Sequence, residues 1–230
     1  MSVIEIKNHP ITHIIVRDFL DSSSRQKLVE SLLPIREKYL ERVTYTDPNG
    51  VERKSTEDTD MFKTGAWLFA LLEEKTELNR DCIDVLESNM WRDDLQQAYE
   101  DTNDLLFSIH SLFSTNSSIL FSQYETGGWL SWHTDGSPVC SASYQFTFKD
   151  RQFLSGGDFL LSEVLKSDNA LQEKIMTYQL LTTDNPLQEK IVSYPFKDNF
   201  LIMFPAKALH KITPVSGYRY SLNYLVDYRV

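Results

Sequence analysis

The sequence NFLIMFPAKALHKITPVSGYRYS occupies residues 199–221 and indicates the architecture of the chain more clearly than any other segment. It begins with an uninterrupted apolar run at 200–204, which is short enough for a buried strand. A stretch with Pro and Gly then separates this run from a second β-like segment at 219–228. Short strands separated by turns are typical of an antiparallel sandwich or jelly roll, and not of alternating βαβ units.

The rest of the chain from about residue 116 has the same character. Segments rich in Ile, Val, Phe, Tyr and Thr recur there, and several alternate apolar with polar residues. We therefore expect a mainly β core over 116–230. The predicted strands cover 117–125, 139–149, 157–164, 190–196, 199–204 and 219–228.

The first half of the chain has a helical pattern. Asp21 and the three serines after it are N-cap candidates, and apolar residues then recur at spacings near 3.6 over 22–41. Residues 64–113 also have mostly helical spacing. The sequence thus predicts an α+β protein with a mainly β core, folded as one domain over 1–230, in which a mostly helical layer (1–115) supports the strands.

Length and composition are those of an ordinary globular protein. The chain has 230 residues, of which 41% are apolar and 24% are charged, so it can bury a sizeable core. Its net charge of −10 argues against a general affinity for nucleic acid or for anionic lipid.

The two cysteines, Cys82 and Cys140, make neither a disulfide framework nor a thiolate metal cluster. Residues 1–10 lack the pattern of a signal peptide, and the longest apolar stretches are too short to span a membrane, so we expect a soluble, cytoplasmic protein.

One short duplication interrupts the β half. Residues 168–178 and 184–194 match at eight of eleven positions, which is too short for a solenoid repeat. We interpret 168–194 as a tandem-duplicated insertion between two strands. It is either an inert surface extension or a flap that helps to bind substrate.

Three residues of the β half have the identity and spacing of metal ligands. His133 and Asp135 form a His-x-Asp pair at a predicted strand end, and alternate residues of a strand share a face. His210 follows the predicted strand at 199–204. Two imidazoles and one carboxylate leave three metal positions open, as in the facial triad of non-haem Fe(II) oxygenases. Zinc hydrolases use similar ligands, so these residues leave the choice of metal open.

An arginine nine residues after His210 distinguishes this pattern from a chance His-x-Asp pair. Arg219 lies in a predicted strand with apolar surroundings, where a guanidinium needs an anion. A guanidinium binds a carboxylate through two parallel hydrogen bonds. A dicarboxylate that chelates the metal at one end and pairs with Arg219 at the other would satisfy both groups.

On these residues, the region 117–228 resembles the Fe(II)/2-oxoglutarate-dependent dioxygenases, and in particular the prolyl 4-hydroxylase-like group. The combination of segments is specific, although each segment alone is not, and it covers about half of the chain. The matching segments, all in the family's order, are Gln123-Tyr124-Glu125-Thr126-Gly127, His133-x-Asp135, Ser155-Gly156-Gly157-Asp158-Phe159, Asn199-Phe200-Leu201-Ile202-Met203-Phe204-Pro205, and His210 through Arg219.

The resemblance implies a double-stranded β-helix, which is a distorted jelly roll, backed by helices. It implies that Arg219 binds the distal carboxylate of 2-oxoglutarate, that O2 is the second co-substrate, and that ascorbate is a candidate reductant. The residues that would hold Fe(II) are His133, Asp135 and His210, and the further candidates for co-substrate contact are Tyr124 and Ser221.

The sequence departs from the family in the strand after the His-x-Asp turn. Related enzymes often carry a tyrosine there that contacts 2-oxoglutarate, whereas this chain has Phe146, which cannot donate a hydrogen bond. Tyr144, two residues earlier, is the candidate substitute. Trp129 and Trp132 flank the His-x-Asp turn and either pack in the core or form a wall of the substrate pocket.

Asp135 bears on the reaction, because related halogenases carry a small residue at that position. The resemblance therefore implies hydroxylation or desaturation of an unactivated C–H bond, with release of succinate and CO2. The substrate, a small molecule or a peptide, stays open between a prolyl residue, a free amino acid and a natural-product intermediate. Two other classes are a cupin-type metal-binding protein such as an isomerase, and a catalytically silent interaction module. Arg219 counts against the first and the intact triad against the second, while the oligomeric state is not predicted.

Overall fold

The structure is a computed structural model that describes part of the chain in detail. The described residues are 2–46, 51–56, 61–68, 80–90, 92–102, 118–135, 140–149, 153–162 and 191–227. The predicted duplication therefore lies outside the described residues except for its last four positions, which are in a strand.

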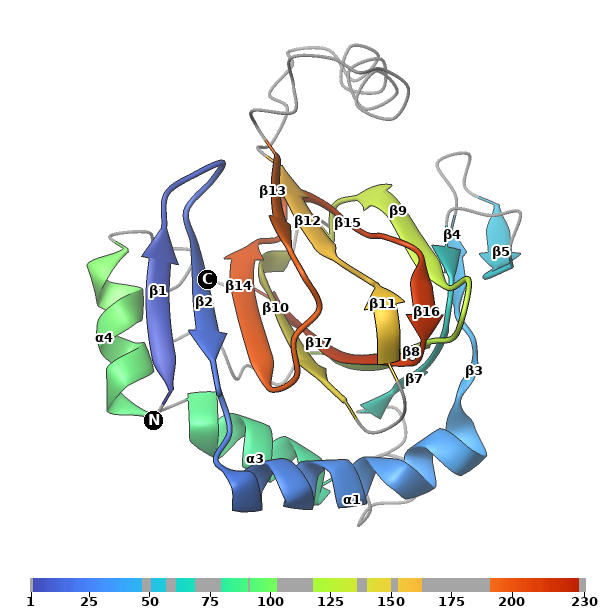
Figure 1. Cartoon of the computed structure of the whole chain (residues 1–230), viewed down its shortest axis with the longest axis horizontal. Helices are drawn as coiled ribbons and strands as arrows, with labels where there is room; N and C mark the ends of the chain where they lie inside the picture. Colours follow the sequence, from blue (N-terminus) through green and yellow to red (C-terminus); the bar gives the residue numbers. More distant parts are fainter. Residues whose placement is uncertain are drawn as a thin grey trace.

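Two antiparallel sheets form most of the fold, and their strands surround a common interior (Figure 1). The larger sheet has eight strands. In spatial order they are β1 (Val3–Lys7), β2 (His13–Arg17), β14 (Phe200–Pro205), β10 (Cys140–Phe148), β17 (Arg219–Asp227), β8 (Ser118–Tyr124), β7 (Thr64–Trp67) and β3 (Glu41–Arg42).

The smaller sheet has five strands and lies across the interior from the larger one. In spatial order they are β13 (Ile191–Tyr194), β12 (Phe159–Ser162), β15 (Leu209–Ile212), β9 (Trp129–His133) and β6 (Met61–Phe62). Two short pairs complete the strands, β11 (Phe153–Gly156) with β16 (Val215–Gly217) and β4 (Thr44–Thr46) with β5 (Glu52–Lys54). This arrangement confirms the predicted mainly β, jelly-roll core, and each of the six strands predicted after residue 116 is present.

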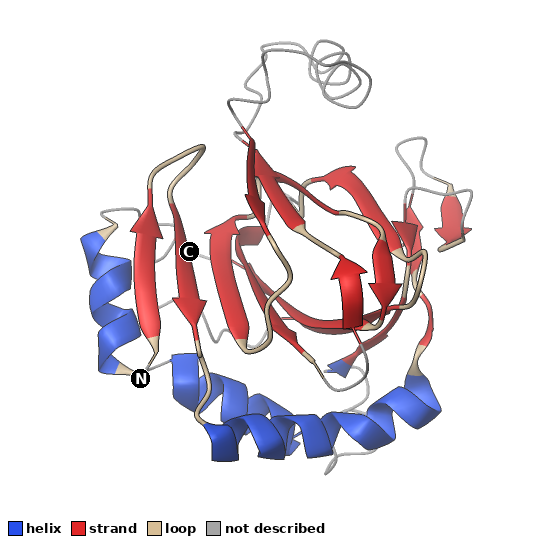
Figure 2. Ribbon diagram, in the orientation of Figure 1, coloured by secondary structure: helices blue, strands red, loops and turns tan. Residues whose placement is uncertain are grey.

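Helices cover the outer face of the larger sheet (Figure 2). They are α1 (Ser22–Tyr39), α3 (Arg80–Met90) and α4 (Asp93–Asp101). The Asp21 side chain caps α1 by accepting a hydrogen bond from the Ser24 N–H at 2.8 Å, as the sequence predicted. None of the helices in the described part of the chain combines the length and apolar character needed to cross a bilayer.

The larger sheet separates two hydrophobic clusters. Its strand β14 is buried on both faces, which explains the uninterrupted apolar run from Phe200 to Phe204. Leu201 and Met203 pack outward with the helices, while Ile202 and Phe204 pack inward between the sheets. Because the outer cluster joins helices of the first half to strands of the second, we propose that the chain is one domain.

The first half contains more strand than the sequence predicted. Residues 64–67 were expected to be helical, yet they form β7 and pair with β8. Thr64 and Gly65 are poor helix formers, and a side chain at Gly65 would meet the carbonyl oxygen of Phe121 at 3.0 Å. Tertiary pairing with β8 thus overrides the helical spacing of the apolar residues that follow.

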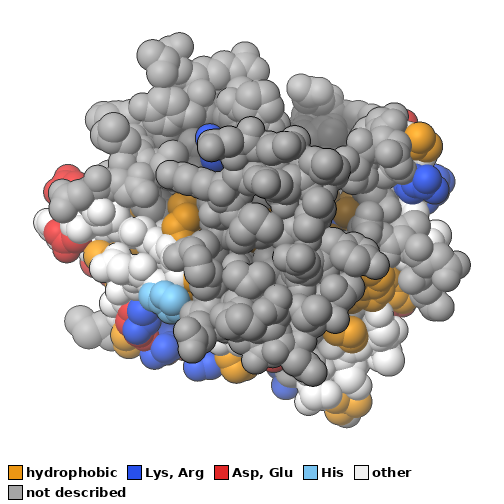
Figure 3. All heavy atoms as spheres, turned by 90° about the horizontal axis from the view of Figure 1, so that it is seen from above, with side chains coloured by type: hydrophobic (Ala, Val, Ile, Leu, Met, Phe, Trp, Pro, Cys, Tyr) orange, Lys and Arg blue, Asp and Glu red, His pale blue; other side chains and the backbone are white. Residues whose placement is uncertain are grey.

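On the face seen in Figure 3, described acidic and basic groups both occur at the margins. The net charge of −10 is therefore not expressed as a uniformly acidic patch among the described residues of this face.

A glycine pair at the end of β11 allows the chain to pass close to β16. Gly156 has φ +76°, and a Cβ there would lie 2.0 Å from the carbonyl oxygen of Pro214. Gly157 has φ +65°, and a Cβ there would lie 2.8 Å from Cδ of Arg219. The segment at 155–159, which matches the family, thus has a local physical cause. Its two glycines allow close packing against Pro214 and against Arg219.

We predict that Gly156→Ala lowers the free energy of unfolding by about 1–3 kcal/mol, because it combines a left-handed φ with a backbone clash. Thermal and urea unfolding measure the loss. Gly127→Ala is the matched control, since Gly127 has φ +85° but no atom within 4 Å of the added Cβ. Equal losses in the two variants would contradict the importance of the close approach.

Candidate metal and co-substrate site

The pairing of β9 with β15 brings two histidines together. His133 and His210 are direct partners in the strand register, and their ring centroids are 4.0 Å apart. Asp135 lies two residues beyond the end of β9, and each of its carboxylate oxygens is 3.5 Å from Nε2 of one histidine. The three ligand atoms all lie within 4.8 Å of one another, close enough for a shared ion. In the described part of the chain this is the one such group.

Hydrogen bonds orient both imidazole rings. Nδ1 of His133 lies 2.9 Å from the carbonyl oxygen of Ser131, and Nδ1 of His210 lies 3.0 Å from that of Ala208. A carbonyl can only accept, so each Nδ1 donates its proton and each Nε2 has a free lone pair. This is the tautomer that a metal ligand needs, and it is fixed by the strand backbone itself.

The surroundings of His210 keep its ring neutral. Its side chain is 3% exposed, and it packs against the rings of Phe159 and Phe204 with centroid distances of 5.5 and 4.7 Å. Burial, reinforced by the nearby His133, lowers the pKa of His210 to about 4. The neutral imidazole is therefore present at pH 7, and this is the form that binds a metal.

Arg219 lies at the start of β17 and points into the interior between the sheets. It is 1% exposed, and burial lowers the pKa of its guanidinium to about 10, which leaves it cationic at pH 7. Its Nε donates to the carbonyl oxygen of Gly157 at 3.0 Å, and its Nη2 donates to Oε1 of Gln145 at 3.0 Å. Its Nη1 is buried without a hydrogen-bond partner. A buried guanidinium with one nitrogen that lacks a partner fits an anionic ligand.

Tyr124 lies beside Arg219. The two residues are direct partners in the β8–β17 register, and the guanidinium carbon is 5.2 Å from the tyrosine ring centroid. The Tyr124 hydroxyl is also buried without a hydrogen-bond partner. Two neighbouring donors without partners thus converge on one region of the interior.

A connected row of polar side chains extends from Arg219 along the inner face of the larger sheet. Gln145, which accepts from Arg219, donates through Nε2 to Oδ1 of Asn223 at 2.7 Å. Asn223 donates through Nδ2 to the hydroxyl oxygens of Ser122 at 3.1 Å and Ser221 at 3.4 Å. Ser221, a predicted co-substrate contact, is fully buried in this row. Gln145, Asn223 and Ser122 were not identified from the sequence.

Gln145 is a β10 residue that contacts Arg219. Phe146 packs in the outer cluster, on the sheet face turned toward the helices. Gln145 thus joins the candidate residues of the site, and the role of Tyr144 stays a prediction. Taking residue 145 as an inward-facing position of the predicted strand would have identified Gln145 from the sequence.

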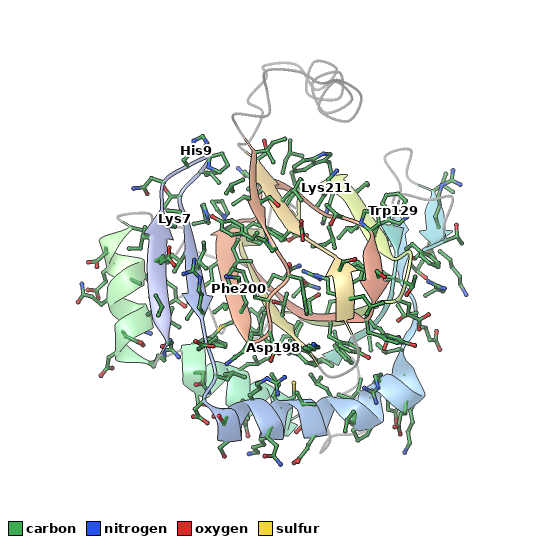
Figure 4. The ribbon with its side chains drawn as sticks, in the orientation of Figure 1. Lys7, His9, Trp129, Asp198, Phe200 and Lys211 are labelled. Carbon is green, nitrogen blue, oxygen red and sulfur yellow. The ribbon has the colours of Figure 1, made fainter. Side chains whose placement is uncertain are left out.

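The two tryptophans lie on the outer face of β9. Trp132 packs with Leu209, and the Lys211 ammonium lies 5.4 Å from its ring centroid. These two neighbours flank His210 on β15 and so project away from it. Trp129 precedes Leu130, which is a member of the inner cluster, so Trp129 also occupies an outward position. Figure 4 labels Trp129 and Lys211. Packing, the first of the two predicted roles, describes Trp132, and a role in the substrate pocket stays a prediction for both tryptophans.

Lys63 is a buried cation that the sequence analysis did not identify. It joins β6 to β7, and its residue is 6% exposed. Its Nζ lies 3.5 Å from Oγ of Ser122 and 5.8 Å from the ring centroid of Tyr124. The available signal was a single lysine after the apolar pair Met61-Phe62.

Solved structures of oxygenases have the same fold. A prolyl hydroxylase from Trichoplax adhaerens, solved with a peptide fragment of the hypoxia inducible factor oxygen degradation domain, has a TM-score of 0.61 and 14% identity, covering 94% of this chain and 83% of that chain. A prolyl-4-hydroxylase from Pseudomonas putida has a TM-score of 0.58 and 14% identity, with coverages of 95% and 93%. A viral collagen prolyl hydroxylase from Paramecium Bursaria Chlorella virus-1, solved with 2OG, has a TM-score of 0.52 and 13% identity, with coverages of 94% and 96%.

These likenesses establish the fold. They confirm the double-stranded β-helix, and the predicted resemblance to prolyl hydroxylases holds at the level of the fold. No protein-family model matches the sequence, and no curated protein does. The reaction and its residues are therefore argued from the site.

We predict that Asp135→Ala weakens Mn(II) binding by more than about 100-fold, because it removes one of three ligands, whereas losing an outer hydrogen-bond partner typically costs 10–100-fold. Calorimetric titration with Mn(II) measures the affinity. Asp198→Ala, which removes a carboxylate that pairs with Arg25, is the control and should bind Mn(II) like the unmodified chain. Undiminished Mn(II) binding by the Asp135 variant would place the metal elsewhere.

Proposed function

We propose that this protein is an Fe(II)- and 2-oxoglutarate-dependent dioxygenase that hydroxylates an unactivated C–H bond. In the overall reaction the substrate, O2 and 2-oxoglutarate give hydroxylated product, succinate and CO2. The observation that carries the proposal is a buried guanidinium whose Nη1 lacks a partner, in the same interior as a His-Asp-His group. A metal site alone would not require that arginine.

The triad suits a metal that keeps open positions. His133, Asp135 and His210 offer two nitrogens and one oxygen, which matches the 2-His-1-carboxylate set of non-haem iron oxygenases. Zinc would accept the same ligands, but it has no redox chemistry and gives Arg219 no role. When bound, Fe(II) would supply the activation of O2, and 2-oxoglutarate would supply the accompanying electrons.

The residues around Arg219 fit a carboxylate. Its free Nη1 and the free hydroxyl of Tyr124 are two donors, and a carboxylate offers two acceptor oxygens. Gln145 holds the guanidinium from one side, and the Gly157 carbonyl holds it from another. Arg219 is thus oriented before any ligand binds, which reduces the entropy lost on binding.

The rings around His210 orient the metal end of the site. Phe159 and Phe204 confine the imidazole, and the carbonyl of Ala208 fixes its proton on Nδ1. The same apolar surroundings exclude water from this side of the site, which strengthens electrostatic interactions there. Ascorbate would serve as an external reductant.

The substrate is proposed only as a class. One similar structure was solved with a peptide fragment, which supports a peptide or small-molecule substrate for this chain. A prolyl residue, a free amino acid and a natural-product intermediate fit the proposal equally. A cupin-type isomerase would leave Arg219 unexplained, and a silent interaction module would not need the triad.

We predict that Arg219→Met raises the KM for 2-oxoglutarate by about 30-fold or more, since truncating one partner of a buried charge pair costs at least about 2 kcal/mol. The measurement is succinate release with Fe(II), ascorbate and varied 2-oxoglutarate. Arg25→Met is the control, because Arg25 contacts Lys149 and Asp198 outside the site. An unchanged KM in the Arg219 variant would move the co-substrate site elsewhere, and absence of succinate release by the unmodified chain would argue against the function itself.

A further inference from the structure

Lys63 has no counterion in the described part of the chain. None of the ion pairs among the described residues involves it. Its contacts there are one long hydrogen bond to Ser122 and the face of the Tyr124 ring. A buried ammonium with so few partners is unfavourable for folding, and it therefore points to a ligand that the side chain meets.

The backbone holds Lys63 in a defined position. The Ser55 hydroxyl accepts a hydrogen bond from the Lys63 N–H at 2.8 Å and donates to the carbonyl oxygen of Met61 at 3.0 Å. Met61 and Phe62 pair with β9 of the smaller sheet, whereas Thr64 and Gly65 pair with β8 of the larger one. Lys63 thus lies where the chain crosses between the sheets, with its side chain buried in the interior.

The strand directions place the ammonium between Arg219 and the metal triad. Strands β8 and β9 are joined by residues 125–128, so Tyr124 and Trp129 lie at the same end of the interior. Moving back along β8 from Tyr124 to Ser122 follows the same direction as moving along β9 toward His133. Arg219 pairs with Tyr124, whereas the Lys63 ammonium lies at Ser122, one inward-facing residue nearer to the triad.

We propose that Lys63 is a second cation of the co-substrate site, and that its ammonium binds the carboxylate next to the keto group of 2-oxoglutarate. This inference rests on the proposed function. Arg219 and Tyr124 would take the distal carboxylate, while Lys63 would pair with the carboxylate next to the keto group. The interior then has one cation for each end of the dicarboxylate.

The unfolding temperature distinguishes a ligand-binding Lys63 from a lysine with a structural role. Replacing an unpaired buried charge by an apolar side chain of similar length is neutral or stabilising. Lys63→Met should therefore unfold at the same or a higher temperature than the unmodified chain in the absence of 2-oxoglutarate. A structural lysine would show the opposite, a lower unfolding temperature and unchanged ligand affinity.

The experiment is calorimetric titration of the Mn(II)-loaded chain with 2-oxoglutarate, which requires no turnover. We expect Lys63→Met to raise the Kd for 2-oxoglutarate about tenfold or more, because a buried charge pair loses one partner. Lys63→Arg, which keeps the charge, should lose less, and it replaces the Met variant if that variant fails to fold. Lys211→Met is the matched control: Lys211 is adjacent to His210 in sequence but lies on the outer face, so its Kd should not change.

A second titration identifies the end of the ligand that Lys63 contacts. 2-Oxobutyrate has the keto acid but lacks the distal carboxylate, so Lys63→Met should weaken it and Arg219→Met should not. Loss of 2-oxoglutarate affinity with unchanged 2-oxobutyrate affinity would assign Lys63 to the distal carboxylate and overturn the proposal. An unchanged 2-oxoglutarate Kd in Lys63→Met would also overturn it while leaving the function intact. If the unmodified chain does not bind 2-oxoglutarate at all, the proposed function and this inference both fail.

Discussion

The register between β9 and β15 is the constraint on which the candidate site depends. His210 is opposite His133 and Ile212 is opposite Leu130, so β9 has one more residue than β15 over this interval. In a regular strand, residues three apart face opposite sides, and either Leu130 or His133 would point away from the interior. The irregularity lets Leu130 join the inner cluster while His133 still meets His210. A slip of one residue would separate the imidazoles.

The larger sheet supplies the other half of the site because its two faces have opposite character. On β17, Tyr220, Leu222 and Tyr224 pack outward in the cluster shared with the helices. Arg219 and Ser221 alternate with them and face the interior, where the polar row begins. The helices thus allow polar groups to line the interior, since they bury the apolar side of the same strands. A site on packed strands also holds its side chains more rigidly than one on loops.

The sequence was sufficient for features that depend on local pattern. The strands after residue 116, the cap of α1 at Asp21 and the His-x-Asp spacing all follow from neighbouring residues. Gln145 could not be assigned in this way, because the inward face of β10 is set by pairing with β17, whose register shifts near Cys140. Strand β7 was missed for a related reason, since its pairing with β8 is not visible in residues 64–67. Lys63 was missed because it is a candidate only on account of its burial, and a single lysine in the sequence does not show whether its side chain is buried.

Two buried cations in one interior also connect stability with ligand binding. Arg219 and Lys63 are each nearly fully buried, and neither forms an ion pair within the described part of the chain. The burial that lowers the pKa of Arg219 to about 10 is the same loss of solvation that makes an incoming anion favourable. A ligand that binds only the folded chain stabilises it in proportion to the logarithm of its concentration. The proposed co-substrate would therefore complete the polar interior as well as the reaction site, since its oxygens would accept the hydrogen bonds that Arg219 Nη1 and the Tyr124 hydroxyl otherwise lack.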